Sequence, residues 1–265
     1  MRRCLLFLTA LLFAIPLILM VSSSLKPADQ LATDPYSIWP DSFAWSNYAE
    51  ALRALPFLRY LRNSLVLCLG GSCGSVVSRA LVAYSLARLK WRGRDVVFAV
   101  IIGTMLLPWH VTMIPRFLLL RELGLYNSLA ALIAPTFLGD AFFIFLLRQF
   151  FRTIPEELSE AARLDGLSEW GIFWRIVLPL SKPALFSLAL CQFFAIGNDF
   201  SGPLRYLSDP HQFPLAYGLE RFISSYSDQT HLLLAAATMF TLPIVILFFL
   251  TQRTFIQGIA ATGLK

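Results

Sequence analysis

Six long apolar runs, separated by short polar segments, dominate the pattern of this chain. A helix needs about 20 mostly apolar residues to cross the hydrocarbon core of a bilayer. Backbone groups in hydrocarbon must pair within their own segment, and the two-residue alternation of barrel strands is absent, so these runs predict helices. The predicted spans are residues 4–22, 63–85, 96–115, 129–150, 183–203 and 232–251, and Pro108 interrupts the third.

Composition supports a membrane protein. The chain is 57% hydrophobic and 14% charged, whereas soluble domains average about 45–50% and 25%. The net charge of +6 could indicate nucleic-acid binding, but the basic residues lie in short segments between apolar runs, which favours a role in membrane orientation. All four cysteines lie inside apolar runs, so we interpret them as buried side chains rather than a disulfide or metal framework. We predict an all-α integral membrane protein.

The Lys and Arg residues predict the orientation. If the N-terminus is cytoplasmic, the cytoplasmic segments (the start, 88–95, 148–182 and the tail) hold 13 of the 22 basic residues, and Arg79 lies within a span. This excess favours an N-in, C-in arrangement. The first run also resembles a signal peptide, but its 18 apolar residues exceed the length of a signal h-region, about 7–15. An uncleaved first span is therefore favoured.

We expect one membrane domain with modest extracytoplasmic elaboration. Residues 1–58 would hold the first helix and an extracytoplasmic loop, residues 59–253 the transmembrane domain, and residues 254–265 a cytoplasmic tail. The loop after the first span is polar and about 40 residues long, which is too short for an independent domain.

The segment TIPEELSEAARLDGLSEWGIFWRIVLP, residues 153–179, is the longest stretch that resembles a soluble protein. Thr153 and Glu156 have the spacing of a capping box, which predicts a helix start. Gly166 predicts a left-handed helix end, and Ser168 predicts the N-cap of a second helix that stops at Pro179. The sequence therefore predicts two short helices on the cytoplasmic side.

The first of these helices has an acidic polar face and a face of small residues. Leu158, Ala161, Ala162 and Asp165 recur with helical spacing on one side. A helix resting on lipid would carry Lys or Arg on its polar face, whereas this acidic face would be repelled by an anionic leaflet. A protein partner fits better than a membrane surface.

The spacing of this segment resembles a known motif. The segment has the order Glu160-Ala161-Ala162, three residues, Gly166, nine residues, Ile176, one residue and Leu178-Pro179. This order resembles the EAA loop of binding-protein-dependent ABC importer permeases. The resemblance covers nearly the whole chain, and it is specifically to carbohydrate-importer permeases like the smaller membrane subunit of the maltose transporter. It is also carried by SSSLKP after the first span, AYSLARLKWRGR (83–94), LLPWHVTMIPRFLLLRELGLYNS (106–128), FLLRQFFRTIPEELSEAARLDG (145–166) and QRTFIQGIAATGLK (252–265).

This resemblance implies that the EAA loop, residues 153–182, is a cytoplasmic coupling helix that docks on a separate ATPase. The contact would be formed by Glu160, Ala161, Ala162, Asp165 and Gly166, and the tail residues Gly258, Gly263 and Lys265 would also reach the ATPase. The implied partners are a second homologous permease, a pair of ATP-binding subunits and an extracytoplasmic solute-binding protein, all at a bacterial inner membrane.

The chain itself is expected to be a non-catalytic subunit without a cofactor. No Gly-Lys-Ser/Thr occurs, so the chain carries no P-loop for ATP. The resemblance implies import of a sugar, an oligosaccharide or a polyol by alternating access, with glycerol phosphate as the other substrate of the same group. The sequence does not choose among these substrates.

Arg79, Asp140, Asn198 and Asp199 are polar residues within predicted spans. Ionisable groups in a membrane are expensive and usually functional, so Asn198, Asp199 and Asp140 are candidates for the substrate path. Arg79 and Asp140 could instead neutralise each other across helices. Gly197 stands at a position where these permeases usually have tryptophan. We therefore expect the glycine to open a cavity, to bend the helix or to alter substrate contacts.

Two other classes of function fit the sequence less well. An ion-coupled secondary transporter could use Asp140 or Asp199, but it would be expected to show internal repeats, and it leaves the EAA loop unexplained. A membrane enzyme would need a Ser/His/Asp, Cys/His or metal-ligand arrangement, and none is present in the sequence. The importer permease is the favoured interpretation.

Overall fold

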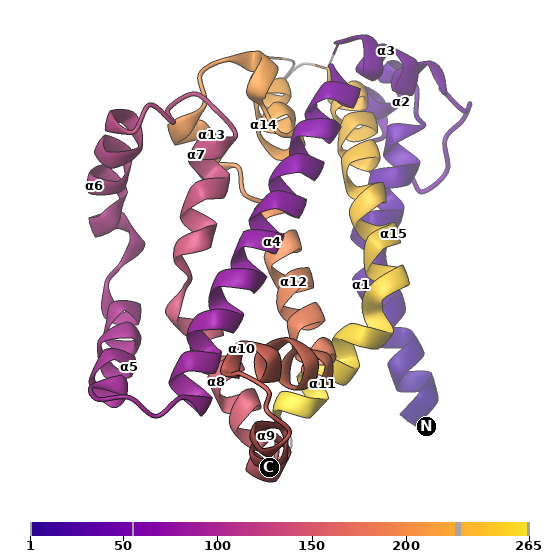
Figure 1. The fold of residues 1–265 in the computed structure, drawn as a ribbon. Helices are drawn as coiled ribbons and strands as arrows, with labels where there is room; N and C mark the ends of the chain where they lie inside the picture. Colours follow the sequence, from indigo (N-terminus) through magenta and orange to yellow (C-terminus); the bar gives the residue numbers. More distant parts are fainter. Residues whose placement is uncertain (1, 55, 226–228, 264–265) are drawn as a thin grey trace. The chain divides into compact units, whose positions relative to one another are not determined.

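A computed structural model describes residues 2–54, 56–225 and 229–263 of the 265-residue chain. These residues form helices and short turns, and no strand occurs among them (Figure 1). The all-α prediction is confirmed. The chain forms two compact units, Met1–Asn63 with Phe213–Phe248, and Ser64–Gln212 with Phe249–Lys265.

The helices follow the predicted runs, with several breaks (Figure 1). They are α1 (Arg2–Ser24), α2 (Ala28–Thr33), α3 (Ser46–Ala54), α4 (Phe57–Arg88), α5 (Arg94–Gly103), α6 (Trp109–Glu122), α7 (Ala130–Ile133), α8 (Ala141–Thr153), α9 (Glu156–Leu164), α10 (Glu169–Ile172), α11 (Leu178–Leu180), α12 (Lys182–Gly197), α13 (Ser201–Tyr206), α14 (Leu215–Ser225) and α15 (Thr230–Gly263).

Among the residues that the structure describes, three helices are long and apolar enough to cross a membrane alone: α1, α4 and α15. Three bent pairs bring the total to as many as six if each pair is one span: Arg94–Leu106 with Trp109–Glu122, Ala130–Leu138 with Ala141–Thr153, and Glu169–Leu180 with Lys182–Gly197. The bends are 102°, 43° and 77° respectively. The number of spans and their orientation in the membrane stay predictions.

Three predicted spans are not continuous helices. Residues 129–150 are divided at Gly139 and Asp140, just before α8. Residues 96–115 are divided at Leu107 and Pro108, because proline lacks a backbone donor and disfavours helical backbone in the residue before it. The helix predicted for residues 183–203 ends at Gly197, and the chain breaks before α13. The predicted interruption at Pro108 is confirmed, whereas the predictions of residues 129–150 and 183–203 as single helices were wrong.

In the unit formed by residues 1–63 and 213–248, buried polar groups organise the loop after α1. The fully buried Lys26 ammonium donates to the carbonyl oxygens of Pro35 at 3.1 Å and Ser37 at 2.6 Å. The buried Asn47 amide donates to the carbonyl oxygens of Ser24 at 3.0 Å and Lys26 at 2.9 Å. Because a buried charge needs partners, these carbonyls fold the loop around Lys26. The loop contains two short helices, α2 and α3.

In the other unit, glycines let α4 approach its neighbours closely. A Cβ atom at Gly71 would lie 2.5 Å from Ile196 Cδ1 on α12. A Cβ atom at Gly74 would lie 2.5 Å from the Phe137 ring and 2.8 Å from Thr136 Oγ1. Membrane helices associate through such small residues because there is little hydrophobic driving force between them in lipid. The Gly-rich stretch of α4 is therefore a helix-packing surface.

Gly74→Leu is expected to destabilise the protein, because the new side chain would overlap Phe137 and Thr136. Overpacking of this kind costs about 1–3 kcal/mol, and it would appear as a lower thermal midpoint of the purified protein in detergent. Gly103→Leu is the matched control, since a Cβ atom at Gly103 meets nothing within 4 Å. Equal thermal midpoints for the two variants would contradict close packing at Gly74.

Candidate functional site

The charged segment folds into α9 and a turn that leads to α10. Gly166 has a φ of +81°, which L-residues with side chains adopt at a cost. Its N–H donates to the Arg163 carbonyl at 3.0 Å, and the Leu167 N–H donates to the Ala162 carbonyl at 2.9 Å. This pair of bonds is a Schellman motif, which satisfies carbonyls at the helix end. The left-handed end predicted at Gly166 is confirmed.

The start of α9 differs from the prediction. Thr153 is the last residue of α8, and its hydroxyl donates to the Phe150 carbonyl at 2.7 Å. Pro155 is the N-cap of α9, and no side chain caps the helix. The predicted capping box between Thr153 and Glu156 is therefore wrong, because α8 extends through Thr153 and its hydroxyl is used within that helix.

The second predicted helix is confirmed at its start but not at its end. The Ser168 hydroxyl accepts from the Gly171 N–H at 3.3 Å, as a cap should. The helical path then continues through a π turn, Phe173–Val177, and through α11 to Leu180. Pro179 does not end it: this proline lies within the helical path, in α11, and the path ends at Leu180.

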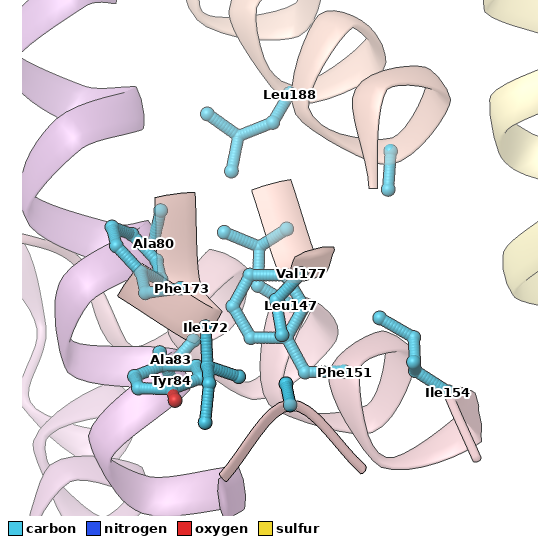
Figure 2. Close-up of a cluster of buried hydrophobic side chains, with 12 residues drawn as sticks. Ala80, Ala83, Tyr84, Leu147, Phe151, Ile154, Ile172, Phe173, Val177 and Leu188 are labelled. Carbon is cyan, nitrogen blue, oxygen red and sulfur yellow. The ribbon is translucent and has the colours of Figure 1, made fainter. Parts of the chain in front are cut away.

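One hydrophobic core joins this loop to three long helices. Figure 2 shows aromatic and aliphatic side chains from the loop and its neighbours turned toward one another. The core consists of Ala80, Ala83 and Tyr84 from α4, Leu147, Phe151 and Ile154 at α8, Ala162, Ile172, Phe173 and Val177 from the loop, and Ala184 and Leu188 from α12. Burying each Ile or Phe stabilises the fold by about 1.5–3 kcal/mol. The loop is therefore held firmly against α4, α8 and α12.

Polar contacts fix the same loop. The Arg163 guanidinium of α9 donates to Glu169 Oε1 at 2.8 Å, and the Tyr84 hydroxyl of α4 donates to Glu169 Oε2 at 2.8 Å. The Arg163 hydrogen bond, helped by that of Tyr84, holds the pKa of the Glu169 carboxyl below its usual range. Arg88, the last residue of α4, donates to the Ile154 carbonyl between α8 and α9. These bonds tie both ends of α9 to α4.

Arg148 joins α8 to α4 and α5 near the loop. Its buried guanidinium donates from Nε to the Leu86 carbonyl at 3.1 Å and lies 3.6 Å from an Asp95 carboxylate oxygen. It also stacks 3.9 Å above the centre of the Phe98 ring. A cation at the C-terminal end of α4 is favoured by the helix dipole. Arg148 therefore fixes three helices at their common end.

Helix α9 has an inner face and an outer face. Ser159 and Ala162 are buried against the chain's own core. Glu160, Ala161 and Asp165 are exposed, and Leu164 is 89% exposed. Grouping Ala161 with Ala162 on one contact face was therefore wrong, because one alanine points inward and the other outward.

The five predicted contact residues thus occupy different environments. Glu160, Ala161, Asp165 and Gly166 are open to a partner, whereas Ala162 helps to position the helix. Leu164 was missed, although its position four residues after Glu160 places it on the same helical face. An apolar side chain this exposed on a charged helix indicates a contact surface.

Arg79 and Asp140 form an ion pair between two helices, as one of the two alternatives predicted. The Arg79 guanidinium of α4, 3% exposed, lies 3.2 Å from Asp140 Oδ2 and donates to Gln192 Oε1 of α12 at 2.9 Å. Asp140 is also the N-cap of α8 and accepts from the Phe143 N–H at 3.2 Å. This cluster joins α4, α8 and α12 at the break between the halves of the fourth predicted span.

Asn198 and Asp199 have local partners. The Asn198 amide donates to the Phe194 carbonyl at 2.9 Å, and Asp199 Oδ1 accepts from the N–H groups of Ser201 at 2.9 Å and Gly202 at 3.0 Å. A Cβ atom at Gly197 would lie 3.4 Å from the Cys68 sulfur of α4. The structure therefore gives Asp140 and Asp199 separate partners and places Gly197 where α12 approaches α4.

The remaining candidates lie near the C-terminus. Gly258 and Gly263 fall within α15, and Lys265 lies outside the described residues. Within residues 2–54, 56–225 and 229–263, no group of three or more His, Cys, Asp or Glu side chains is arranged to hold a metal ion.

Comparison with known proteins identifies the family. Residues 80–260, more than half of the chain, match the family described as binding-protein-dependent transport system inner membrane component. The chain belongs to this family. The resemblance carried by the EAA spacing is confirmed, and the matched residues include the whole loop.

Similar proteins are sugar-system permeases. The arabinooligosaccharides transport system permease protein AraQ of Bacillus subtilis is 31% identical over 97% of this chain and 92% of its own length. The sulfoquinovosyl glycerol transport system permease protein SmoH of Agrobacterium fabrum is 30% identical over 94% and 88%. A crystal structure of a bacterial ABC transporter involved in import of the acidic polysaccharide alginate superposes with a TM-score of 0.85 at 26% identity, covering 96% of this chain and 95% of that one.

Family membership settles the general role. The chain is an inner-membrane permease subunit of a binding-protein-dependent ABC transporter, and it is not an enzyme. ATP is hydrolysed on a partner ATPase, and the family works with a separate substrate-binding protein.

Gly166→Ala is expected to destabilise the loop, because alanine adopts the left-handed conformation only at a cost in free energy. Its Cβ atom would touch nothing within 4 Å, so no new contact offsets this cost. The cost is about 1–2 kcal/mol, measured as a lower thermal midpoint and faster proteolysis within residues 153–182. Gly166→Asn is the control, since asparagine tolerates this conformation better. Identical behaviour of the two variants would contradict a conformational role for Gly166.

Asp140→Asn is expected to be more destabilising than the double change Asp140→Asn with Arg79→Met. Asparagine can still cap α8, but the single variant leaves the buried Arg79 charge without its carboxylate. Removing one partner of a buried pair costs about 3–5 kcal/mol, whereas replacing both is far milder. Thermal midpoints in detergent measure this, and additive losses would contradict the pairing.

Proposed function

We propose that this chain is the translocating subunit of an ATP-driven importer for a sugar, an oligosaccharide or a polyol. The printed functions of its relatives support a carbohydrate-like solute: AraQ serves arabinooligosaccharides, SmoH serves sulfoquinovosyl glycerol, and the NgcG permease of Streptomyces coelicolor, 28% identical, serves diacetylchitobiose. These solutes share glycosidic chemistry but differ in size and charge. Glycerol phosphate remains the other substrate within this proposal.

The two-faced helix α9 carries the proposal for how transport is driven. Its outer face offers Glu160, Ala161, Leu164 and Asp165 to an ATPase surface, with Ala161 allowing close approach and the carboxylates available to basic groups. Its inner face is continuous with the core shared by α4, α8 and α12. A displacement of α9 by an ATPase would therefore be transmitted to these helices, because close-packed interiors transmit strain.

The membrane arrangement completes the proposal. The six apolar segments would cross the bilayer with both termini in the cytoplasm, so that the loop 153–182 faces the ATPase. The solute would pass by alternating access at an interface with a second homologous permease chain. The C-terminal tail, with Gly258, Gly263 and Lys265, would add a further contact to the ATPase.

An ion-coupled transporter is less well supported. Asp140 is paired with Arg79 and caps α8, and Asp199 accepts from the first two N–H groups of α13, so both carboxylates already hold structural partners. A proton- or sodium-coupling carboxylate would need to change partners in each cycle. The contribution of Asn198, Asp199 and Asp140 to a substrate path stays part of the importer proposal.

Ala161→Trp should abolish ATP-dependent uptake, because the indole would hold α9 away from the ATPase. We expect at least a tenfold loss of uptake and loss of the ATPase subunits on affinity purification. The fold should survive, since Ala161 is exposed, and Ala161→Ser at the same position is the control that keeps the surface small. Normal ATPase association and uptake by Ala161→Trp would exclude docking at this face.

A further inference from the structure

The loop between α4 and α5 carries a cationic depression that the transport proposal does not use. Residues 90–96 line a shallow cavity of about 480 Å³. They include Lys90, Arg92 and Arg94 against the single carboxylate of Asp95. An excess of two positive charges around one cavity favours an anionic ligand.

The cations of this depression are largely free to bind. The Arg92 side chain is exposed and has no hydrogen bond or ion pair within the part of the chain that the structure describes. The Lys90 ammonium, 84% exposed, lies 3.7 Å from Glu156, and a solvent-exposed pair of this kind contributes little. Arg94 is anchored by the Leu89 carbonyl at 3.3 Å and by Asp95 at 3.3 Å. Lys90 and Arg92 are therefore the groups available to a ligand.

Apolar surface continues directly from this depression. Helix α5 begins at Arg94 and leaves Val96, Val97 and Val100 exposed, and it belongs to a pair of helices apolar enough to span a membrane. Trp91 lies beside the cations, half-exposed, with its indole N–H donating to the Ser85 carbonyl at 3.3 Å. This order of groups, with cations first, then tryptophan and then aliphatic surface, is the one found at a membrane interface.

We infer that this surface binds an anionic glycerophospholipid. The lipid phosphate would accept charge-assisted hydrogen bonds from Lys90 and Arg92, and Trp91 would lie at the level of the glycerol backbone. An acyl chain would run along Val96 and Val100. A soluble anion would use only the cations, and a protein partner would leave the valines of a membrane helix uncovered, whereas a phospholipid accounts for both parts of the surface.

Native mass spectrometry of the detergent-purified transporter tests this assignment, with phosphatidylglycerol and phosphatidylcholine as probes. The wild type should retain phosphatidylglycerol in preference to phosphatidylcholine. The Lys90→Gln, Arg92→Gln double variant should lose roughly tenfold or more of that preference, since each basic residue near an anionic surface contributes about a fivefold factor. Lys90→Arg with Arg92→Lys should retain it, because both charges remain.

Arg116→Gln with Arg121→Gln is the matched control, because it removes two exposed cations from another apolar helix, α6. An equal loss in this control would show attraction to charge in general and overturn the site. Displacement of the lipid by millimolar inorganic phosphate would identify a plain anion site and would also overturn the lipid assignment. The assignment would be overturned as well if the Lys90→Gln, Arg92→Gln variant lost its association with the ATPase but retained the lipid. Lipid retention is measured without transport, so its outcome is independent of the solute and of docking by α9.

Discussion

The hydrophobic core beneath α9 is the constraint on which the rest of this structure depends. A charged cytoplasmic-type helix would ordinarily be free to move on a flexible loop, yet here Ala162, Ile172, Phe173 and Val177 are buried with side chains from α4, α8 and α12. Hydrogen bonds from Arg88 and Tyr84 reinforce the same junction. Because the loop and three helices share one close-packed interior, none of them can shift without the others. The permease therefore holds its EAA loop rigidly against these three helices.

Two other features hold together the interior of the unit formed by Ser64–Gln212 and Phe249–Lys265, and both suit a lipid environment. Glycines on α4 let backbones approach, which supplies packing where a hydrophobic driving force is missing. Arg79 binds Asp140 and Gln192 from two further helices and so places a buried charge at the point where the fourth predicted span is broken. The break and the charge belong together, because the carboxylate that neutralises Arg79 also satisfies the start of α8. Polar groups here stabilise an irregular backbone that hydrocarbon would not tolerate.

Local pattern in the sequence predicted the elements but not their faces. Apolar run length identified the helices, and the glycine and serine at the turn of the EAA loop were correctly assigned, because such signals act within a few residues. The capping box at Thr153 failed because a neighbouring helix continued through it, which only the packing of Phe151 and Ile154 explains. Contacts between distant segments also decide three features that local pattern does not predict. These are the inward turn of Ala162, the exposure of Leu164, and Gln192 as the second partner of Arg79. The family spacing predicts a docking role for the loop, but it does not predict this geometry.

The π turn at Phe173–Val177 sets the rotational phase of α11 and α12, the helices after it. A π turn accommodates one residue more than an α-helical turn, and in an α-helix one residue corresponds to about 100° of rotation. The wider turn thus decides which side of these two helices faces the core that holds Phe173 and Leu188. A family member lacking this extra residue would have to redistribute its apolar positions along the whole of α12. An insertion or deletion at this turn would rotate the helix that follows, and it would also change the spacing from Gly166 to Leu178-Pro179 that carries the family resemblance.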